Sequence, residues 1–204
     1  MNLKKINPNL QNALVELGLT DANEMQQETF STIKSGADAV IQADNGSGKT
    51  TTLVLNVVQK LDKPLGESTR ALIIALNKEK VLETLSIFEN INKYNNLRVI
   101  ACHDKSDIDD DKNVISAGMD VIIGTATRIN EMFSSAGFNI NTIKIFAVDD
   151  ADEIFRLRHD AIIQRLSMSV EKTQRLFFCS QITERVEVLA DKIMIEPFFF
   201  EMDE

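Results

Sequence analysis

The chain has 204 residues, of which 44% are hydrophobic and 26% are charged, so it can bury a sizeable core. It has no apolar run of membrane-spanning length, and its N-terminal residues lack the long apolar stretch of a secretion signal. The formal net charge of -9 opposes binding to nucleic-acid phosphates unless the basic residues gather on one face.

The two cysteines, Cys102 and Cys179, stand at no metal-ligand spacing and lie beside apolar runs typical of strands. We therefore expect both to be buried free thiols. Unpaired thiols suit a reducing compartment, and together with the composition they predict a cytoplasmic protein that works without a membrane.

Short apolar runs rich in β-branched residues alternate along the chain with longer amphipathic stretches. The predicted strands are Ala39–Ile41, Ala71–Ala75, Arg98–Ala101, Val121–Ile123, Ile145–Val148, Leu176–Cys179 and Phe198–Phe200. The predicted helices are Leu10–Leu17, Met25–Lys34, Lys49–Lys60, Lys78–Asn92, Asn113–Ala117, Arg128–Ser134, Ile154–Ser167 and Glu184–Ile193. This alternation predicts an α/β fold with a mostly parallel central sheet and helices on both faces.

A phosphate-binding loop is predicted at Ala43–Thr50, between the apolar run Ala39–Ile41 and a helix-compatible run. Only Ala43 departs from the usual pattern, which opens with Gly. The alternative is a plain turn rich in Gly, Ser and Asn, which the strand-loop-helix context and the Lys-Thr pair make less favourable. The predicted nucleotide-binding residues of this segment are Asp44, Asn45, Gly46, Ser47, Gly48, Lys49, Thr50 and Thr51.

Each residue type in this loop has a physical role. Gly46 and Gly48 allow backbone angles that let successive N–H groups surround phosphate oxygens, and the following helix adds its positive end. Lys49 is expected to reach the β- and γ-phosphates of a nucleotide, and the Thr50 hydroxyl to hold Mg²⁺.

The segment Ile145–Asp152 predicts the second half of a nucleotide site, because a buried strand ends there in acids. We assign Asp149 to Mg²⁺ and Asp150 to orienting the attacking water, which makes Lys49, Asp149 and Asp150 the predicted catalytic residues. The alternative is a solvated acidic turn that caps the next helix. A phosphate loop earlier in the chain favours the metal site.

The order and spacing of these segments resemble the first of the two RecA-like domains of DEAD-box ATP-dependent RNA helicases, over nearly the whole chain. The Asp-Glu-Ala-Asp motif of that family appears here as Asp149-Asp150-Ala151-Asp152. The resemblance implies a three-layer RecA-like P-loop NTPase domain over residues 1–204, with a helical lead-in at 1–36 and the P-loop core at 37–204.

The lead-in also resembles the family. Asn7-Pro8 to Leu19 stands in place of the opening helix, with Gly18-Leu19 for the family's Gly-Phe, and Met25-Gln26 replaces Ile-Gln. The resemblance implies that Gln26 reads adenine, which an amide can do because it both donates and accepts hydrogen bonds.

The motifs that touch RNA in the family are altered. Leu76-Asn77-Lys78-Glu79-Lys80 stands where the family has Pro-Thr-Arg-Glu-Leu, so only Glu79 is identical, although Lys78 keeps a charge. Thr125–Arg128 stands for Thr-Pro-Gly-Arg and keeps its first and last residues. The RNA contacts implied are Lys78, Thr125 and Arg128, although Thr125 equally suits a helix cap.

The acidic run Asp104–Asp111 stands where the family has a Gly-Gly segment, and it is expected to be a solvated face that repels phosphate. The family's Ser-Ala-Thr motif, which links the acidic motif to strand separation, appears as Ser180-Gln181-Ile182. The resemblance implies a Ser180–Asp152 bond, while Ile182 has no hydroxyl. Asp150 is one methylene shorter than glutamate, and a displacement of about 1 Å can lower a rate by roughly a hundredfold.

The chain ends near Phe198–Phe200, about where the family's linker to a second RecA-like domain begins. At least one of these rings should point outward from a strand, and packing on a helix is favoured over docking of a partner. The family's second domain supplies arginine fingers, which are worth roughly a thousandfold or more in turnover. We therefore expect weak hydrolysis, or none, from this domain alone.

These patterns predict the ATP- and Mg²⁺-binding first domain of a DEAD-box-type RNA helicase, with unwinding only beside a second RecA-like domain. The alternative is a degenerate, stand-alone ATP-binding pseudo-helicase that acts as a protein-interaction switch, which the acidic charge favours. A small phosphotransferase is disfavoured by the segment around Gln26 and by the absence of an Arg-rich lid. The expected partners are ATP, single-stranded or duplex RNA, and a second RecA-like domain or another protein.

Overall fold

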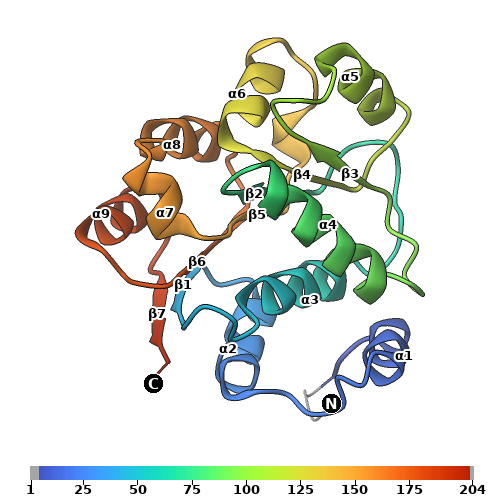
Figure 1. The fold of residues 1–204 in the computed structure, drawn as a ribbon, viewed down its shortest axis with the longest axis vertical. Coiled ribbons are helices and arrows are strands. Elements are labelled where there is room, and N and C mark those ends of the chain that lie inside the picture. Colours follow the sequence, from blue (N-terminus) through green and yellow to red (C-terminus); the bar gives the residue numbers. More distant parts are fainter. Residues whose placement is uncertain (1–4, 203–204) are drawn as a thin grey trace.

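The computed structural model describes residues 5–202, which fold around a seven-stranded sheet (Figure 1). The strand order is β3-β4-β2-β5-β6-β1-β7, and every pairing is parallel. The strands are β1 (Ala39–Gln42), β2 (Ala71–Ala75), β3 (Val99–Cys102), β4 (Val121–Thr125), β5 (Ile145–Val148), β6 (Gln174–Cys179) and β7 (Phe198–Glu201). All seven predicted strands are therefore present.

Helices cover both faces of the sheet, so the fold has three layers (Figure 1). The helices of one face are α1 (Pro8–Glu16), α2 (Glu24–Ser35), α3 (Lys49–Leu61) and α4 (Lys78–Ile91). Those of the other face are α5 (Ile108–Ser116), α6 (Ala126–Ser134), α7 (Ala151–Arg156), α8 (Asp160–Met168) and α9 (Glu184–Ile193). A 3₁₀ turn, η1 (Ile140–Thr142), leads into β5. The predicted α/β architecture is confirmed.

The strands bury both of their faces, which explains their continuous apolar runs. In β2, Ile73 belongs to the apolar cluster under α1–α4, and its neighbour Ile74 belongs to the cluster under α5–α9. Because all strands run in one direction, their carboxyl ends meet at one edge of the sheet. The chain leaves that edge through the loop between β1 and α3 and through the segment that follows β5.

The helix predicted at Ile154–Ser167 is wrong, because two helices, α7 and α8, occupy this range. The chain turns at Arg158, whose φ is 66°. Its N–H donates to the carbonyl of Phe155, and the next N–H donates to that of Ile154. These bonds close the end of α7 at a position where glycine is usual, so no residue type indicated the break between the two helices.

The start predicted for the helix at Asn113–Ala117 is also wrong, because α5 begins at Ile108. The Asp107 carboxylate accepts bonds from the N–H groups of residues 109 and 110 and so caps the helix. Within the acidic run, Asp111 is buried and accepts a 2.6 Å bond from Ser106 Oγ. The run is therefore only partly the solvated face that we expected.

The end of the described chain is more exposed than predicted. In the edge strand β7, Phe198 and Phe199 are 52% and 42% exposed, whereas Phe200 is half-buried against the α1–α4 cluster. The packing interpretation is thus wrong for the first two rings. Residues 1–4 of the expected lead-in lie outside the described residues. Among residues 5–202, no helix is long and apolar enough to cross a membrane.

Candidate nucleotide-binding site

The loop between β1 and α3 has the backbone of a phosphate cradle. Gly46 and Gly48 have φ angles of 84° and 91°, a region that side chains disfavour. Gly48 is the residue before the first turn of α3, so the positive end of that helix faces the loop. A Cβ on Gly48 would lie 3.4 Å from Asn23 Nδ2, which packs against the loop.

Lys49 is buried at the centre of this loop. Its ammonium donates to the carbonyl oxygens of Ala43 at 2.6 Å and Asp44 at 2.9 Å. Asn45 Oδ1 and Ser180 Oγ lie at 3.4 Å from the same nitrogen. Backbone carbonyl oxygens of the loop therefore hold the buried ammonium of Lys49, the residue that the sequence analysis assigned to phosphate binding.

Thr50 and Asp149, the two residues predicted to hold Mg²⁺, are brought together across the site. The Thr50 hydroxyl donates to Asp149 Oδ2 at 2.5 Å and joins α3 to the end of β5. Asp149 is 2% exposed, and burial raises its pKa to about 6, although the Thr50 bond acts in the opposite direction. Its second oxygen, Oδ1, is buried without a hydrogen-bond partner among the described residues. A hard oxygen ligand of this kind fits Mg²⁺.

Asp150 follows directly and adopts a left-handed backbone with φ of 54°. Its side chain is half-buried, and burial raises the pKa of its carboxyl, while the positive charges of Lys80 and Lys49 lower it. The turn gives Asp149 and Asp150 different surroundings, because the first is buried against Thr50 and the second lines the cavity beside the loop.

Ser180 and Asp152 are close together, but not through the hydroxyl bond that we expected. Asp152 Oδ2 accepts the backbone N–H groups of Ser180 at 3.2 Å and Gln181 at 3.1 Å. The Ser180 hydroxyl instead donates to Asn45 Oδ1 at 2.8 Å. Ile182, which lacks a hydroxyl, donates its N–H to Gln42. This motif therefore connects to the acidic segment by backbone bonds and to the phosphate loop by one side chain.

Gln26 lies at the start of α2, where it forms a capping box with Asn23. The Asn23 side chain accepts the N–H of Gln26 at 2.9 Å, and Gln26 Oε1 accepts the N–H of Asn23 at 3.2 Å. Asn23 also donates to the carbonyl of Ser47 at 2.9 Å, which joins α2 to the phosphate loop. Gln26 is 6% exposed and caps α2. Its recognition of adenine stays a prediction.

A cavity of about 240 Å³ lies beside the phosphate loop. Besides predicted residues, it is lined by Lys80, Glu83 and Ile87 of α4, which the sequence analysis did not assign to the site. Their spacing of three and four residues places them on one helix face. That periodicity was readable, but nothing in the sequence showed that α4 packs beside α3, as the structure does.

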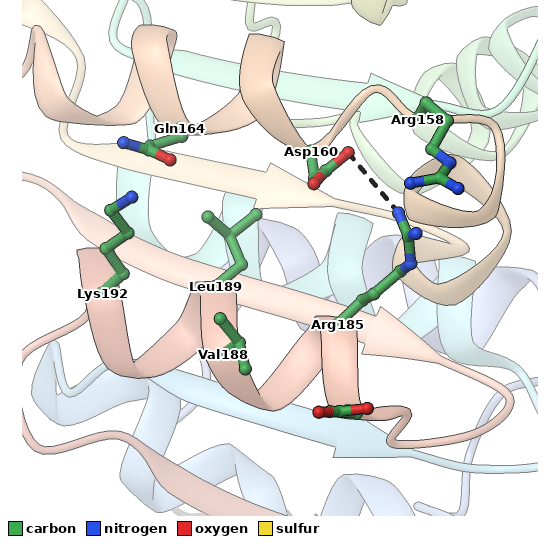
Figure 2. Close-up of a pocket in the computed structure, with 8 residues that line it drawn as sticks. Arg158, Asp160, Gln164, Arg185, Val188, Leu189 and Lys192 are labelled. Atoms are coloured by element: carbon green, nitrogen blue, oxygen red, sulfur yellow. Dashed lines mark ion pairs between the residues drawn. The ribbon is translucent and has the colours of Figure 1, made fainter.

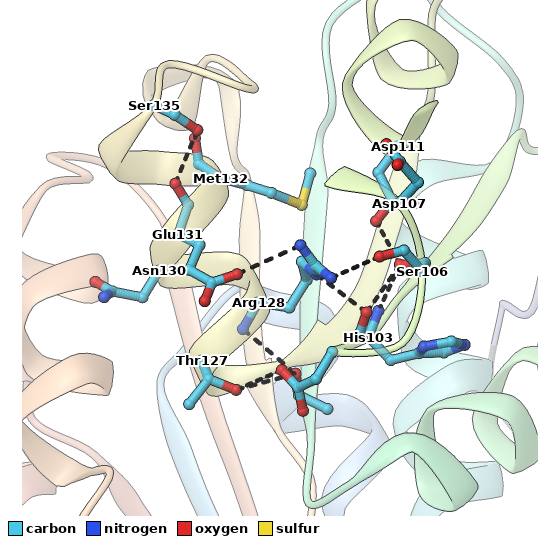
Figure 3. Close-up of polar contacts among 12 residues, drawn as sticks. His103, Ser106, Asp107, Asp111, Thr127, Arg128, Asn130, Glu131, Met132 and Ser135 are labelled. Carbon is cyan, nitrogen blue, oxygen red and sulfur yellow. Dashed lines mark hydrogen bonds and ion pairs between the residues drawn. The ribbon is translucent and has the colours of Figure 1, made fainter. Parts of the chain in front are cut away.

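The residues predicted to contact RNA have internal partners, with one exception. The Thr125 hydroxyl caps α6 and donates to Asp104 at 3.1 Å, and Thr127 donates to the same carboxylate at 2.7 Å. Arg128 is 6% exposed and donates to the carbonyls of His103 at 3.0 Å and Ser106 at 2.7 Å (Figure 3). The ammonium of Lys78 alone has no partner within residues 5–202.

A larger hollow of about 430 Å³ lies between α8 and α9, on the face opposite α3 (Figure 2). It is lined by Arg158, Asp160, Gln164, Glu184, Arg185, Val188, Leu189 and Lys192. Arg185 approaches Asp160 at 3.9 Å. The lining mixes both signs of charge and includes none of the predicted site residues.

A comparison with protein families decides to which family this chain belongs. The model of the DEAD/DEAH box helicase family matches residues 23–187. The chain belongs to the DEAD/DEAH box helicase family. The matched range contains the phosphate loop and the acidic segment after β5, the two halves of the site described above.

Curated relatives of the chain are named ATP-dependent RNA helicases. The chain is 28% identical over 198 residues to "ATP-dependent RNA helicase eIF4A" of Meyerozyma guilliermondii and equally similar to that of Aspergillus niger. Each match covers 97% of this chain and 49% of the relative. The chain therefore spans about half the length of these curated relatives.

Solved structures show the fold. A DEAD box protein from the hyperthermophile Methanococcus jannaschii superposes with a TM-score of 0.94 at 20% identity, over 100% of this chain and 56% of that one. The yeast DEAD-box splicing factor Prp28 superposes with a TM-score of 0.88 at 20% identity, over 100% of this chain and 52% of that one. The RecA-like architecture predicted from the sequence is confirmed.

Proposed function

We propose that this chain binds ATP with Mg²⁺ as the first RecA-like domain of a DEAD-box RNA helicase. The observation that supports this most directly is the pairing of Thr50 with Asp149 beside a buried, loop-held Lys49. Three groups from two distant segments converge on one edge of the sheet. This is the arrangement that P-loop NTPases use for phosphate and metal.

Each residue would have a distinct part in binding. The loop N–H groups and the Lys49 ammonium would hold the phosphates, since both present positive charge to one small volume. Asp149 Oδ1, which is buried without a partner, and the Thr50 hydroxyl would hold Mg²⁺. When bound, Mg²⁺ would neutralise charge on the β- and γ-phosphates. Asp150 would accept a proton from the attacking water or orient it.

RNA unwinding belongs to this proposal only with a second RecA-like domain, in the same chain or in another. The curated relatives are named ATP-dependent RNA helicases and are about twice as long as this chain. The alternative function, an ATP-binding switch that contacts another protein, is favoured by one observation. Thr125 and Arg128, the residues expected to contact RNA, are engaged inside the protein.

The proposal is tested by titrating the purified protein with a fluorescent ATP analogue and Mg²⁺, with and without single-stranded RNA. Lys49→Ala should weaken binding by about a hundredfold or more, because it removes the buried cation of the loop. The matched control is Lys93→Ala, which removes an equal charge at an exposed lysine outside the cavity. No binding by the wild type at millimolar nucleotide contradicts the proposal. Binding that RNA leaves unchanged at low salt favours the switch.

A further inference from the structure

Helix α4 brings a second lysine to the cavity beside the phosphate loop. Lys80 lines this cavity together with Gly46, Gly48, Thr50 and Asp150. The position is unexpected, because the segment Leu76–Lys80 has a lysine where the motif that it resembles ends in leucine. A flexible cation therefore stands in the wall of a cavity whose other wall is the phosphate loop.

The ion pair that Lys80 forms in the structure is weak because it is exposed to solvent. Its ammonium lies 2.9 Å from Glu83 Oε2, one helical turn away, and the two side chains are 40% and 54% exposed. Exposed pairs of this kind contribute little stability, so a stronger anion can displace the glutamate. Glu83, then Asp150 and Asp149, raise the pKa of Lys80, which places its charge in the field of the site's carboxylates.

We propose that Lys80 is a second phosphate-binding cation. When a nucleoside triphosphate binds, Lys80 breaks its ion pair with Glu83 and contacts the terminal phosphate. This rests on the proposed binding of ATP at the loop. Lysine suits the role because its ammonium is a compact charge with three donors on a long flexible stem. Lys49 is held by the loop carbonyls, whereas Lys80 is held by one exposed side chain. The second lysine can therefore respond to an additional phosphate.

The consequence is discrimination between triphosphate and diphosphate. ADP lacks the terminal phosphate, so it would leave the Lys80–Glu83 pair intact and bind without help from Lys80. ATP would gain one charge-assisted contact, which is roughly twice as strong as a neutral hydrogen bond. Glu83 would oppose triphosphate as a like charge in the same cavity wall, so the pair sets the selectivity of the site.

The test compares ATP and ADP affinities, each with Mg²⁺, by calorimetric titration of the wild type and Lys80→Leu. The variant places leucine where the similar motif has it. We expect ATP to bind about tenfold more weakly to the variant and ADP to change by less than about twofold. Lys80→Arg should keep most of the preference. The matched control is Lys93→Leu, which removes another exposed, glutamate-paired lysine that lies outside the cavity.

Two further outcomes keep this inference separate from the proposed function. If the wild type binds neither nucleotide, the proposed function fails, and this inference fails with it. If the wild type binds both nucleotides and Lys80→Leu leaves them unchanged or weakens them equally, only the role of Lys80 is overturned. Glu83→Gln should change ATP affinity in the opposite direction to Lys80→Leu. Because it releases Lys80, it should strengthen ATP binding by about a few-fold and leave ADP binding nearly unchanged.

Discussion

The phosphate-loop edge and the segment 103–131 contain similar polar groups but satisfy them differently. At the loop, Ser47 Oγ, Asp149 Oδ1 and Asp152 Oδ1 are buried without partners among residues 5–202. In the described segment 103–131, no buried side-chain nitrogen or oxygen lacks a hydrogen-bond partner. Asp104 and Arg128, for example, both form hydrogen bonds within the protein. Leaving a buried polar atom without a partner is unfavourable, and a bound ligand, ion or ordered water can supply the missing partner. The phosphate-loop edge thus keeps unpartnered acceptors, as the proposed binding of ATP and Mg²⁺ requires, whereas Asp104 and Arg128 are already bonded within the protein.

The largest expected effect comes from removing the charge at Asp149. Asp149→Asn should weaken Mg²⁺-dependent nucleotide binding by about a hundredfold, because the buried oxygens lose their charge. Without nucleotide, the same variant should be more stable at neutral pH by about 2 kcal/mol, since it avoids burying a charged carboxylate. Calorimetric titration and thermal unfolding measure the two effects. Loss of both stability and binding would show that the carboxylate serves the scaffold instead.

The same group gives a pH dependence with a definite sign. Burial raises the pKa of Asp149 from an ordinary 3.8 to about 6, so the folded protein binds this proton more tightly than the unfolded chain. Its contribution is therefore favourable at low pH and is lost as pH rises through the range from about 4 to 6. In Asp149→Asn this part of the stability–pH curve should disappear, which unfolding titrations at several pH values would reveal.

Arg128 should behave as a scaffold residue. Arg128→Met removes the donor that its side chain supplies to the carbonyls of His103 and Ser106, and we expect a loss of about 3 kcal/mol. The melting temperature should then fall by about 6–12 °C, with nucleotide affinity unchanged. The matched control is Arg156→Met, an exposed arginine that should change stability by less than about 0.5 kcal/mol. A stable Arg128→Met protein with weakened RNA binding would instead support the RNA contact.

The sequence predicted the sheet well because each buried strand is a continuous apolar run. It failed where a residue performed a task usually given to another type. Arg158 adopts the left-handed conformation that glycine normally supplies, so the break between α7 and α8 was not recognised. Asp107 caps α5 from within an acidic run that looked like a solvated surface. Composition describes such a run, but only its contacts show which acids are internal.

The candidate site was predictable to a similar degree. The residues of the loop and Asp149 follow from local pattern, and the structure brings Thr50 and Asp149 together. Lys80 was not predicted, because its place in the cavity depends on the packing of α4 against α3. The resemblance also predicted that Thr125 contacts RNA, whereas its hydroxyl donates a hydrogen bond to Asp104. Motifs identify residue types, and their partners depend on neighbours elsewhere in the chain.

Asp150 offers a smaller test of how far the loop edge is prepared for chemistry. Asp150→Glu restores the longer acid and should raise single-turnover ATP hydrolysis by about tenfold or more, since displacements near 1 Å carry effects of that size. The left-handed backbone at this position tolerates aspartate better than glutamate, so a stability loss of about 0.5 kcal/mol should accompany the gain. Unchanged hydrolysis would indicate that reach is not what limits this domain.

The smallest expected effect concerns Asp104, which accepts both threonine hydroxyls at the start of α6. Asp104→Ala frees Thr125 and Thr127 and removes a negative charge, so single-stranded RNA should bind about threefold more tightly at low salt. Asp109→Ala makes an equal charge change at an exposed acid that contacts neither threonine. If both variants gain equally, net charge alone limits RNA binding, and the threonines have no part in it. A gain confined to Asp104→Ala would mean that the segment 103–131 can still bind phosphate once its internal carboxylate is removed.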